Sequence, residues 1–269
     1  MRRGATIMAV AMATAAAAAL TAAAALAGPT GTPVTAPDGN AQAIGAALKP
    51  RKLFAKSWTP AALEVTARVT NAIRPGGVPS PTTHVVIDFP KSGRVSSKGF
   101  PTCEAAKLQN VSTEVAEREC RSALIGRGTA EALLPVGSQV FAVPQEVTAF
   151  NGVPRGGRPV VLLHSYGAVP VQTALVLTGV VTNLDKEGYG PRLDVEVPLI
   201  AGGAGALTYF NVTVQKQIRR GGKNVSYIQA KCPASRRLKL RSVFTFLDGQ
   251  TADPLFSGAC VQRPEPRRR

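Results

Sequence analysis

The sequence predicts an all-β protein, an antiparallel β-sandwich with one short disulfide-pinned helical insertion. Short apolar segments recur along the chain with turn residues between them, which is typical of sandwiches. Several of these segments alternate apolar and polar residues, as half-buried antiparallel strands do. Only one stretch has helical spacing, so the chain lacks the crossover helices that a parallel sheet needs.

Residues 1–27 have the features of a signal peptide. Arg2 and Arg3 precede an almost purely apolar run, and Ala25-Leu26-Ala27 has the small-x-small pattern that signal peptidase cleaves. The run is long enough to span a membrane, so a retained anchor is the alternative. Its alanine content makes it weakly hydrophobic and favours cleavage. We therefore expect a protein secreted to the cell envelope or beyond, with no membrane span after cleavage.

The rest of the chain divides into a leader, a domain and a tail. Residues 28–50 mix Pro, Thr, Gly and Ala without periodicity and predict a flexible leader. Residues 51–261 carry the strand signals of one β-sandwich domain, and their number is usual for an all-β domain. Residues 262–269 form a basic end broken by proline, which we expect to be disordered.

Strand signals follow one another through the domain. Alternation is clearest in residues 63–70, and Gly221-Gly222 predicts a tight hairpin because glycine supplies the positive φ of a primed turn. The helical stretch is 103–121, where Glu114 and Arg118 form an i,i+4 pair. The expected strands are 52–58, 63–70, 83–89, 140–150, 160–166, 172–183, 193–200, 207–218, 225–231 and 238–247.

The four cysteines all lie beyond the signal peptide. An oxidising compartment favours their pairing, and three connectivities are possible. Proximity in sequence favours Cys103–Cys120 and Cys232–Cys260, and each bridge would stabilise the fold by about 3 kcal/mol in the chain-entropy model. The alternative is a zinc site, but the chain has no C-x2-C pair and no histidine close to these cysteines.

The cysteines belong to a wider pattern of turns and bridges. The chain contains Phe100-Pro101-Thr102-Cys103, Cys120, Gly126-Arg127-Gly128, Tyr189-Gly190, Cys232-Pro233 and Cys260. This pattern is similar to a set of uncharacterised secreted proteins from high-GC bacteria that share an F-P-x-C … C … G-x-G … C-P … C skeleton. The likeness spans roughly residues 60–261 and implies export and a β-rich fold, without implying an activity. One departure is Arg121, which follows Cys120 where the group has Pro.

A hydrolase is the enzymatic alternative. Residues 159–167 resemble the strand that precedes the oxyanion loop of α/β-hydrolases, and His164, Ser165 and His84 could in principle form a catalytic set with a carboxylate such as Asp88. The chain has no G-x-S-x-G elbow after this strand and no histidine after His164. We therefore expect a protein that is not an enzyme.

Carboxylates are the remaining chemical candidates. Asp194 and Glu196 share a strand face, and Asp185 and Glu187 flank a turn, so either pair could bind Ca²⁺ or act in acid–base chemistry. Basic neighbours beside both pairs favour a solvated, charge-balanced edge. We expect neither a metal nor a cofactor.

Charge distribution is the strongest functional signal. Lys and Arg number 32 against 16 Asp and Glu, a formal net charge of +16, or about +14 without the signal peptide. No acidic residue lies between Glu196 and Asp248, and we expect this segment to dock on an anionic envelope polymer. Aromatic residues make up 5% of the chain, too few for sequence-specific nucleic-acid recognition. The alternative is a solvated basic edge that prevents edge-to-edge aggregation. The candidate polyanion-binding residues are Lys216, Arg219, Arg220, Lys223, Arg237, Lys239 and Arg241.

Overall fold

The computed structural model describes residues 30–73, 76–169 and 172–265. The predicted signal peptide, residues 1–27, lies outside the described residues. Within these ranges, the chain has no helix whose length and apolar character would let it cross a membrane.

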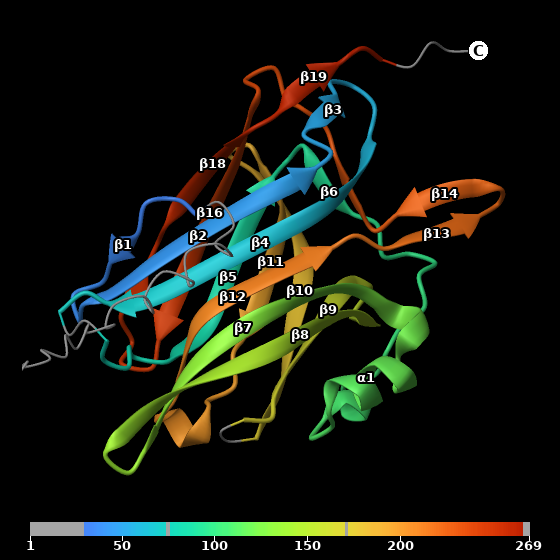
Figure 1. Ribbon diagram of the computed structural model, residues 1–269. Coiled ribbons are helices and arrows are strands. Elements are labelled where there is room, and N and C mark those ends of the chain that lie inside the picture. The colour runs from blue at the N-terminus through green and yellow to red at the C-terminus, as the bar shows by residue number, and fades with distance from the viewer. Residues whose placement is uncertain (1–29, 74–75, 170–171, 266–269) are drawn as a thin grey trace, which may run out of the picture.

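One large antiparallel sheet forms the body of the molecule (Figure 1). Its main strands are β1 (Val34–Thr35), β2 (Asn40–Lys49), β4 (Thr59–Asn71), β5 (Thr82–Pro90), β7 (Leu124–Val136), β8 (Gln139–Arg155), β9 (Arg158–Gly167), β10 (Thr173–Lys186), β11 (Tyr189–Glu196), β12 (Ala206–Val214), β16 (Arg237–Phe246) and β17 (Thr251–Ala252). Three short strands branch from it: β6 (Gly93–Val95), β15 (Ile228–Ala230) and β18 (Leu255–Ala259).

The strand order is β1-β2-β4-β12-β7-β8-β9-β10-β11-β5-β16-β17. This sheet curls until its two ends meet. β18 pairs with β16 at one end and also lies beside β2, close to the other end. Gly31 fits between these ends, and a Cβ there would lie 2.6 Å from the Leu255 carbonyl oxygen. The antiparallel all-β prediction is therefore confirmed, and the two layers of the sandwich are two halves of one curled sheet.

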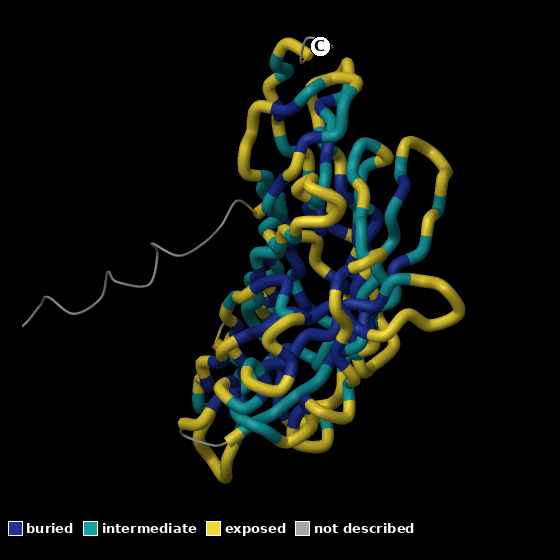
Figure 2. The backbone as a smooth tube through the Cα atoms, turned by 90° about the vertical axis from the view of Figure 1, so that its right-hand side faces the viewer, coloured by how far each residue is buried: buried dark blue, intermediate teal, exposed yellow. Residues whose placement is uncertain are grey.

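The core lies inside the curl. Alternation places Leu63, Val65, Ala67 and Val69 of β4 on the inner face, as the sequence predicts. Inward residues of the other strands complete one apolar cluster. Figure 2 shows buried backbone concentrated along the middle of the molecule and exposed backbone in the loops at its ends.

The helical insertion, residues 103–123, covers the outer face of β8 and β9. It comprises η1 (Ala105–Leu108), α1 (Thr113–Glu119) and η2 (Arg121–Ala123). The side chain of Ser112 caps α1 by accepting a hydrogen bond from the Val115 amide. The predicted Cys103–Cys120 bridge is present and pins the two ends of the insertion together.

The flexible leader predicted for residues 28–50 is wrong, because β1 and β2 lie inside it. β2 pairs with β4 along its whole length, and its first half is largely buried. A strand that is buried on both faces needs no alternation of apolar and polar residues, and here small residues such as Ala43 and Gly45 fill the second face. The absence of periodicity in this segment indicated burial, not flexibility.

β7 is a second strand that the sequence does not predict. Gly126 and Gly128 resemble turn signals, yet both lie inside this strand. A Cβ on Gly128 would lie 1.9 Å from the Asn211 carbonyl oxygen of β12, and one on Gly126 would lie 2.3 Å from that of Thr213. The glycines therefore permit two strands to approach closely.

The end of the chain is more ordered than predicted. β19 (Val261–Arg263) pairs in parallel with β3 (Lys52–Phe54), and the predicted Cys232–Cys260 bridge lies directly before it. The disordered tail expected for 262–269 is thus wrong for its first two residues, and 266–269 lie outside the described ranges.

The predicted glycine hairpin is confirmed. β13 (Gln217–Arg220) and β14 (Lys223–Ser226) pair across Gly221 and Gly222, whose φ angles are 53° and 74°. This hairpin, called the basic hairpin below, projects from the body on the side away from β16 and β18 (Figure 1).

Candidate functional site

The residues proposed for a hydrolase do not meet. His164 lies on β9 and His84 on β5, and β10 and β11 separate these strands. Ser165 follows His164 directly on a strand, so the two side chains point to opposite faces of the sheet. The Ser165 hydroxyl donates to the side-chain oxygen of Gln145 inside the curl. The geometry therefore offers no serine–histidine pair.

His164 instead fastens the insertion to the sheet. Its ring is fully buried, and Nε2 lies 3.0 Å from the carbonyl oxygen of Val111, to which it donates. Burial lowers the pKa of His164, and the hydrogen bond to Val111 opposes this effect only in part. The imidazole is therefore a neutral structural donor.

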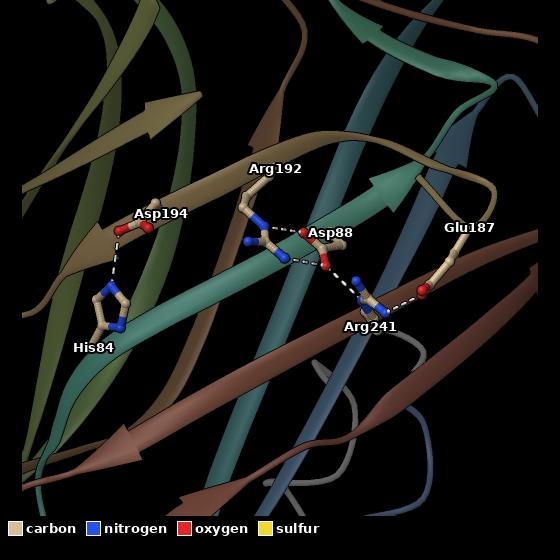
Figure 3. A network of polar contacts seen from close by, with 6 residues as sticks. All are labelled: His84, Asp88, Glu187, Arg192, Asp194 and Arg241. Atoms are coloured by element: carbon tan, nitrogen blue, oxygen red, sulfur yellow. Dashed lines mark hydrogen bonds and ion pairs between the residues drawn. The ribbon is translucent and has the colours of Figure 1, made fainter. Parts of the chain in front are cut away.

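His84 belongs to a different group on the outer face of β5 and β11. Its Nε2 lies 2.9 Å from Oδ1 of Asp194, and both side chains are substantially exposed. Figure 3 shows this pair beside a second, larger network around Asp88. Both belong to the same outer sheet surface.

Asp88 holds three strands together. It lies opposite Arg192 of β11 and Arg241 of β16 in the strand register, and both arginines bind its carboxylate with N–O distances of 2.6 Å (Figure 3). Arg241 also binds Glu187 at 3.1 Å and stacks on the ring of Tyr189. Burial alone would raise the pKa of Asp88, but the two arginines outweigh it and lower this pKa below its usual value.

This network includes one residue of the acid-free segment between Glu196 and Asp248, called the basic segment below. Arg241 was expected to bind a polyanion, but its guanidinium is already held by two carboxylates. Arg237 donates to the hydroxyl of Ser257, and Lys239 is exposed on the same face of β16. β16 therefore offers a weaker basic surface than its sequence suggests.

The structure does not unite the two halves of the basic segment. Arg219, Arg220 and Lys223 belong to the basic hairpin, and Lys216 directly precedes it. The hairpin lies apart from β16 (Figure 1). Arg220 donates to the Lys98 carbonyl oxygen. Among the described residues, the hairpin's basic side chains form no ion pair, so the tip keeps its positive charge.

Three of the four carboxylates considered for Ca²⁺ have a basic side chain as partner. Asp185 binds Lys91, Glu187 binds Arg241 and Asp194 binds His84. Over the described ranges, no cluster of three or more potential metal ligands occurs.

The feature that the sequence did not reveal is a cavity of about 160 Å³ inside the curl, called the inner cavity below. Its accessible surface is almost entirely apolar and comes mainly from β4, β5, β9, β10, β11 and β12, with further residues from β2, β6, β15 and β16. Several inward side chains, such as Leu193 and Phe210, are only partly buried although they face the core. Alternation marks which residues point inward, but it does not reveal whether they fill the space.

A second cavity of about 270 Å³ lies at the seam, which is the junction of β2 with β16 and β18. Ala46 and Leu48 line it from β2, and Leu240 and Phe256 line it from the opposite end of the sheet. Leu63 and Phe89 line both this seam cavity and the inner cavity. The two spaces are therefore neighbours that share these side chains. Arg51 also lines the seam cavity and is exposed.

Comparison with protein-family models, with curated proteins and with solved structures found no match. The two disulfides favour an extracellular or otherwise oxidising environment. The apolar interior is the feature of this chain best suited to binding a small molecule.

Proposed function

We propose that this protein is a secreted, non-enzymatic carrier that holds an apolar small molecule in the inner cavity. The observation that carries the proposal is the cavity itself, an apolar space lined by strands from both halves of the sheet. Ligand sites are typically concave and mostly apolar, and the interior of a curled sheet is a frequent place for them.

The energetic cost of the space supports this proposal. The space is partly open, so leaving about 160 Å³ unfilled costs at most roughly 4 kcal/mol, at the value of about 24 cal/mol per Å³ for closed apolar cavities. That is a large fraction of the 5–15 kcal/mol by which domains are typically stable. Larger side chains at positions such as Ala67 would remove this cost. A ligand that fills the cavity explains why the space is kept.

Binding of N-phenyl-1-naphthylamine, a neutral apolar fluorescent probe, tests the proposal. We expect saturable binding with enhanced fluorescence, because the probe leaves water for an apolar interior. Ala67→Phe places a ring in the cavity and should weaken binding at least tenfold. Thr70→Phe adds the same ring to the exposed outer side of β4 and is the matched control.

Thermal unfolding of both variants should first show that each is folded. Absence of saturable probe binding by the unsubstituted protein would overturn the carrier function. Equal weakening by Ala67→Phe and Thr70→Phe would also contradict it, because a surface effect would then explain the loss.

Docking on an anionic envelope polymer is the second candidate. It is favoured by the basic hairpin, whose exposed cations include Arg219 and Lys223 and which projects from the body of the molecule (Figure 1). Binding to such a polymer should weaken steeply with salt, because each neutralised anionic group releases a counterion.

Heparin affinity measured against salt concentration tests the hairpin. Replacing Lys216, Arg219 and Lys223 by Gln should flatten the slope of log K against log salt by about two to three units. Replacing Arg121, Arg155 and Arg158, which are exposed elsewhere, should have a much smaller effect. Equal losses would indicate diffuse net charge and contradict a hairpin site.

A further inference from the structure

We propose that the seam is the portal of the inner cavity and that its ligand is a single-chain amphiphile with an anionic head group. Arg51 would bind the head, and the tail would pass Leu63 and Phe89 into the interior. This inference rests on the proposed carrier function and specifies its substrate class.

The seam is the weakest part of the curled sheet that surrounds the inner cavity. Every other junction along the main sheet is a ladder of paired strands, whereas β2 and β18 lie side by side without a ladder in the described residues. Small residues line both sides of this junction, with Ala46 and Ala47 on β2 and Gly258 and Ala259 on β18. The two sides can separate without breaking a row of backbone hydrogen bonds.

The seam cavity leads toward the interior. Leu63 and Phe89 form part of its wall and part of the wall of the inner cavity, and both remain partly exposed. These side chains have no polar atoms, so a displaced rotamer leaves no hydrogen bond unsatisfied. An apolar tail that enters at the seam therefore meets apolar side chains along its whole path.

Arg51 supplies the chemistry of the head group. It is the charged residue among the described side chains that line the seam cavity, and no carboxylate pairs with it there. Its carbonyl oxygen accepts a hydrogen bond from the Val261 amide, and the neighbouring Cys260 is tied to Cys232. The position of Arg51 at the edge of an apolar space is thus fixed by the surrounding backbone.

A cation at the mouth of an apolar path selects an anion attached to an apolar tail. Guanidinium groups bind carboxylates and phosphates through paired, charge-assisted hydrogen bonds. The exposure of Arg51 lets the head group remain hydrated while the tail is buried. A neutral ligand with the same tail would fill the interior but gain nothing from Arg51.

Displacement of the naphthylamine probe by dodecyl ligands tests the head-group site. Dodecanoate and dodecyl phosphate should displace the probe at concentrations about tenfold lower than dodecanol, and dodecyltrimethylammonium should be weaker still. The two anions separate a carboxylate preference from a phosphate preference. Arg51→Gln should abolish the advantage of the anions and leave dodecanol unchanged. Lys239→Gln, on the outer face of β16, is the matched control.

Binding rates test the portal. Ala46→Leu narrows the seam and should slow both association and dissociation of the neutral probe several-fold, with little change in its Kd. Ala67→Phe should instead change the Kd. Faster exchange in Ala46→Leu, or unaltered rates, would contradict the portal.

The failures of the two proposals are distinguishable. If the probe does not bind, the carrier function is wrong. If the probe binds in the cavity but Arg51→Gln retains the anion preference, or if the protein has no such preference, the amphiphile inference alone is wrong.

Discussion

The insertion and the seam are two apolar regions of the same sheet that differ in how closely their side chains pack. Between the insertion and the sheet, Leu108 and Phe150 are fully buried, and Cys103–Cys120 holds the insertion in place. At the seam, Leu63 and Phe89 stay partly exposed although Cys232–Cys260 lies close by. One region is closed by close packing, and the other keeps an open space.

The difference shows that this fold can cover apolar surface completely where that surface has only a structural role. The insertion forms a separate, well-filled cluster on the outer face of β8 and β9. A chain that builds such a cover could also fill the seam with a few larger residues in place of alanine and glycine. The open space at the seam is therefore better explained by the proposed ligand binding than by an inability of the chain to fill it.

Truncation of one aromatic ring in each region should give the largest difference in the free energy of unfolding between the two regions. Phe150→Ala should lower the free energy of unfolding by about 4 kcal/mol, because it removes a fully buried ring from a filled cluster. Phe89→Ala should cost less than about 2 kcal/mol, because that ring already borders two cavities. Guanidinium unfolding of both variants measures the difference. Equal losses would mean that the two regions are packed alike.

The strands beside the seam depend on charge, so acid should loosen them. The pKa of Asp88 is lowered in the folded protein, so its ionised form stabilises the fold above the ordinary carboxyl pKa. This stability should be lost as the pH falls below about 4. Asp88→Asn should cost about 2 kcal/mol at neutral pH, since charged hydrogen bonds from two arginines are removed.

Unfolding of the Asp88→Asn variant from pH 7 to pH 2 provides the measurement. The variant should lose less stability on acidification than the unsubstituted protein. An unchanged acid profile would show that the network contributes little to the seam side of the sheet.

The stability contributed by the insertion side should depend on pH more weakly than that of the Asp88 network. Its loss should begin at a higher pH. Burial lowers the pKa of His164, so the unfolded chain takes up a proton more readily than the folded one. Stability should therefore decrease as the pH falls below about 6.5. His164→Gln keeps a donor for Val111 and removes the titrating group. Its stability between pH 7 and pH 5 should vary less than that of the unsubstituted protein, and an equal slope would exclude this role.

Local patterns in the sequence predict features that are themselves local. The glycine hairpin and both disulfides join segments that are close in sequence, and they are confirmed. β2 was missed because burial on both faces removes alternation. β7 was missed because Gly126 and Gly128 serve close packing against a strand that is distant in sequence.

The candidate site depends on information that is absent from local patterns. Arg241 binds Asp88 only because the register of β16 on β5 places them opposite each other. The inner cavity depends on how side chains from ten strands meet, and alternation does not determine that. The basic segment was recognised as a charge pattern, but the structure divides it between the basic hairpin and β16.

The junction of β2 with β18 has a consequence for how the molecule is made. β2 emerges early during synthesis, yet the segment beside it, residues 255–259, emerges more than 200 residues later. Contacts between such distant segments make folding slow. The sheet therefore cannot close on a ribosome that still holds the last strands, and closure must follow the synthesis of nearly the whole chain.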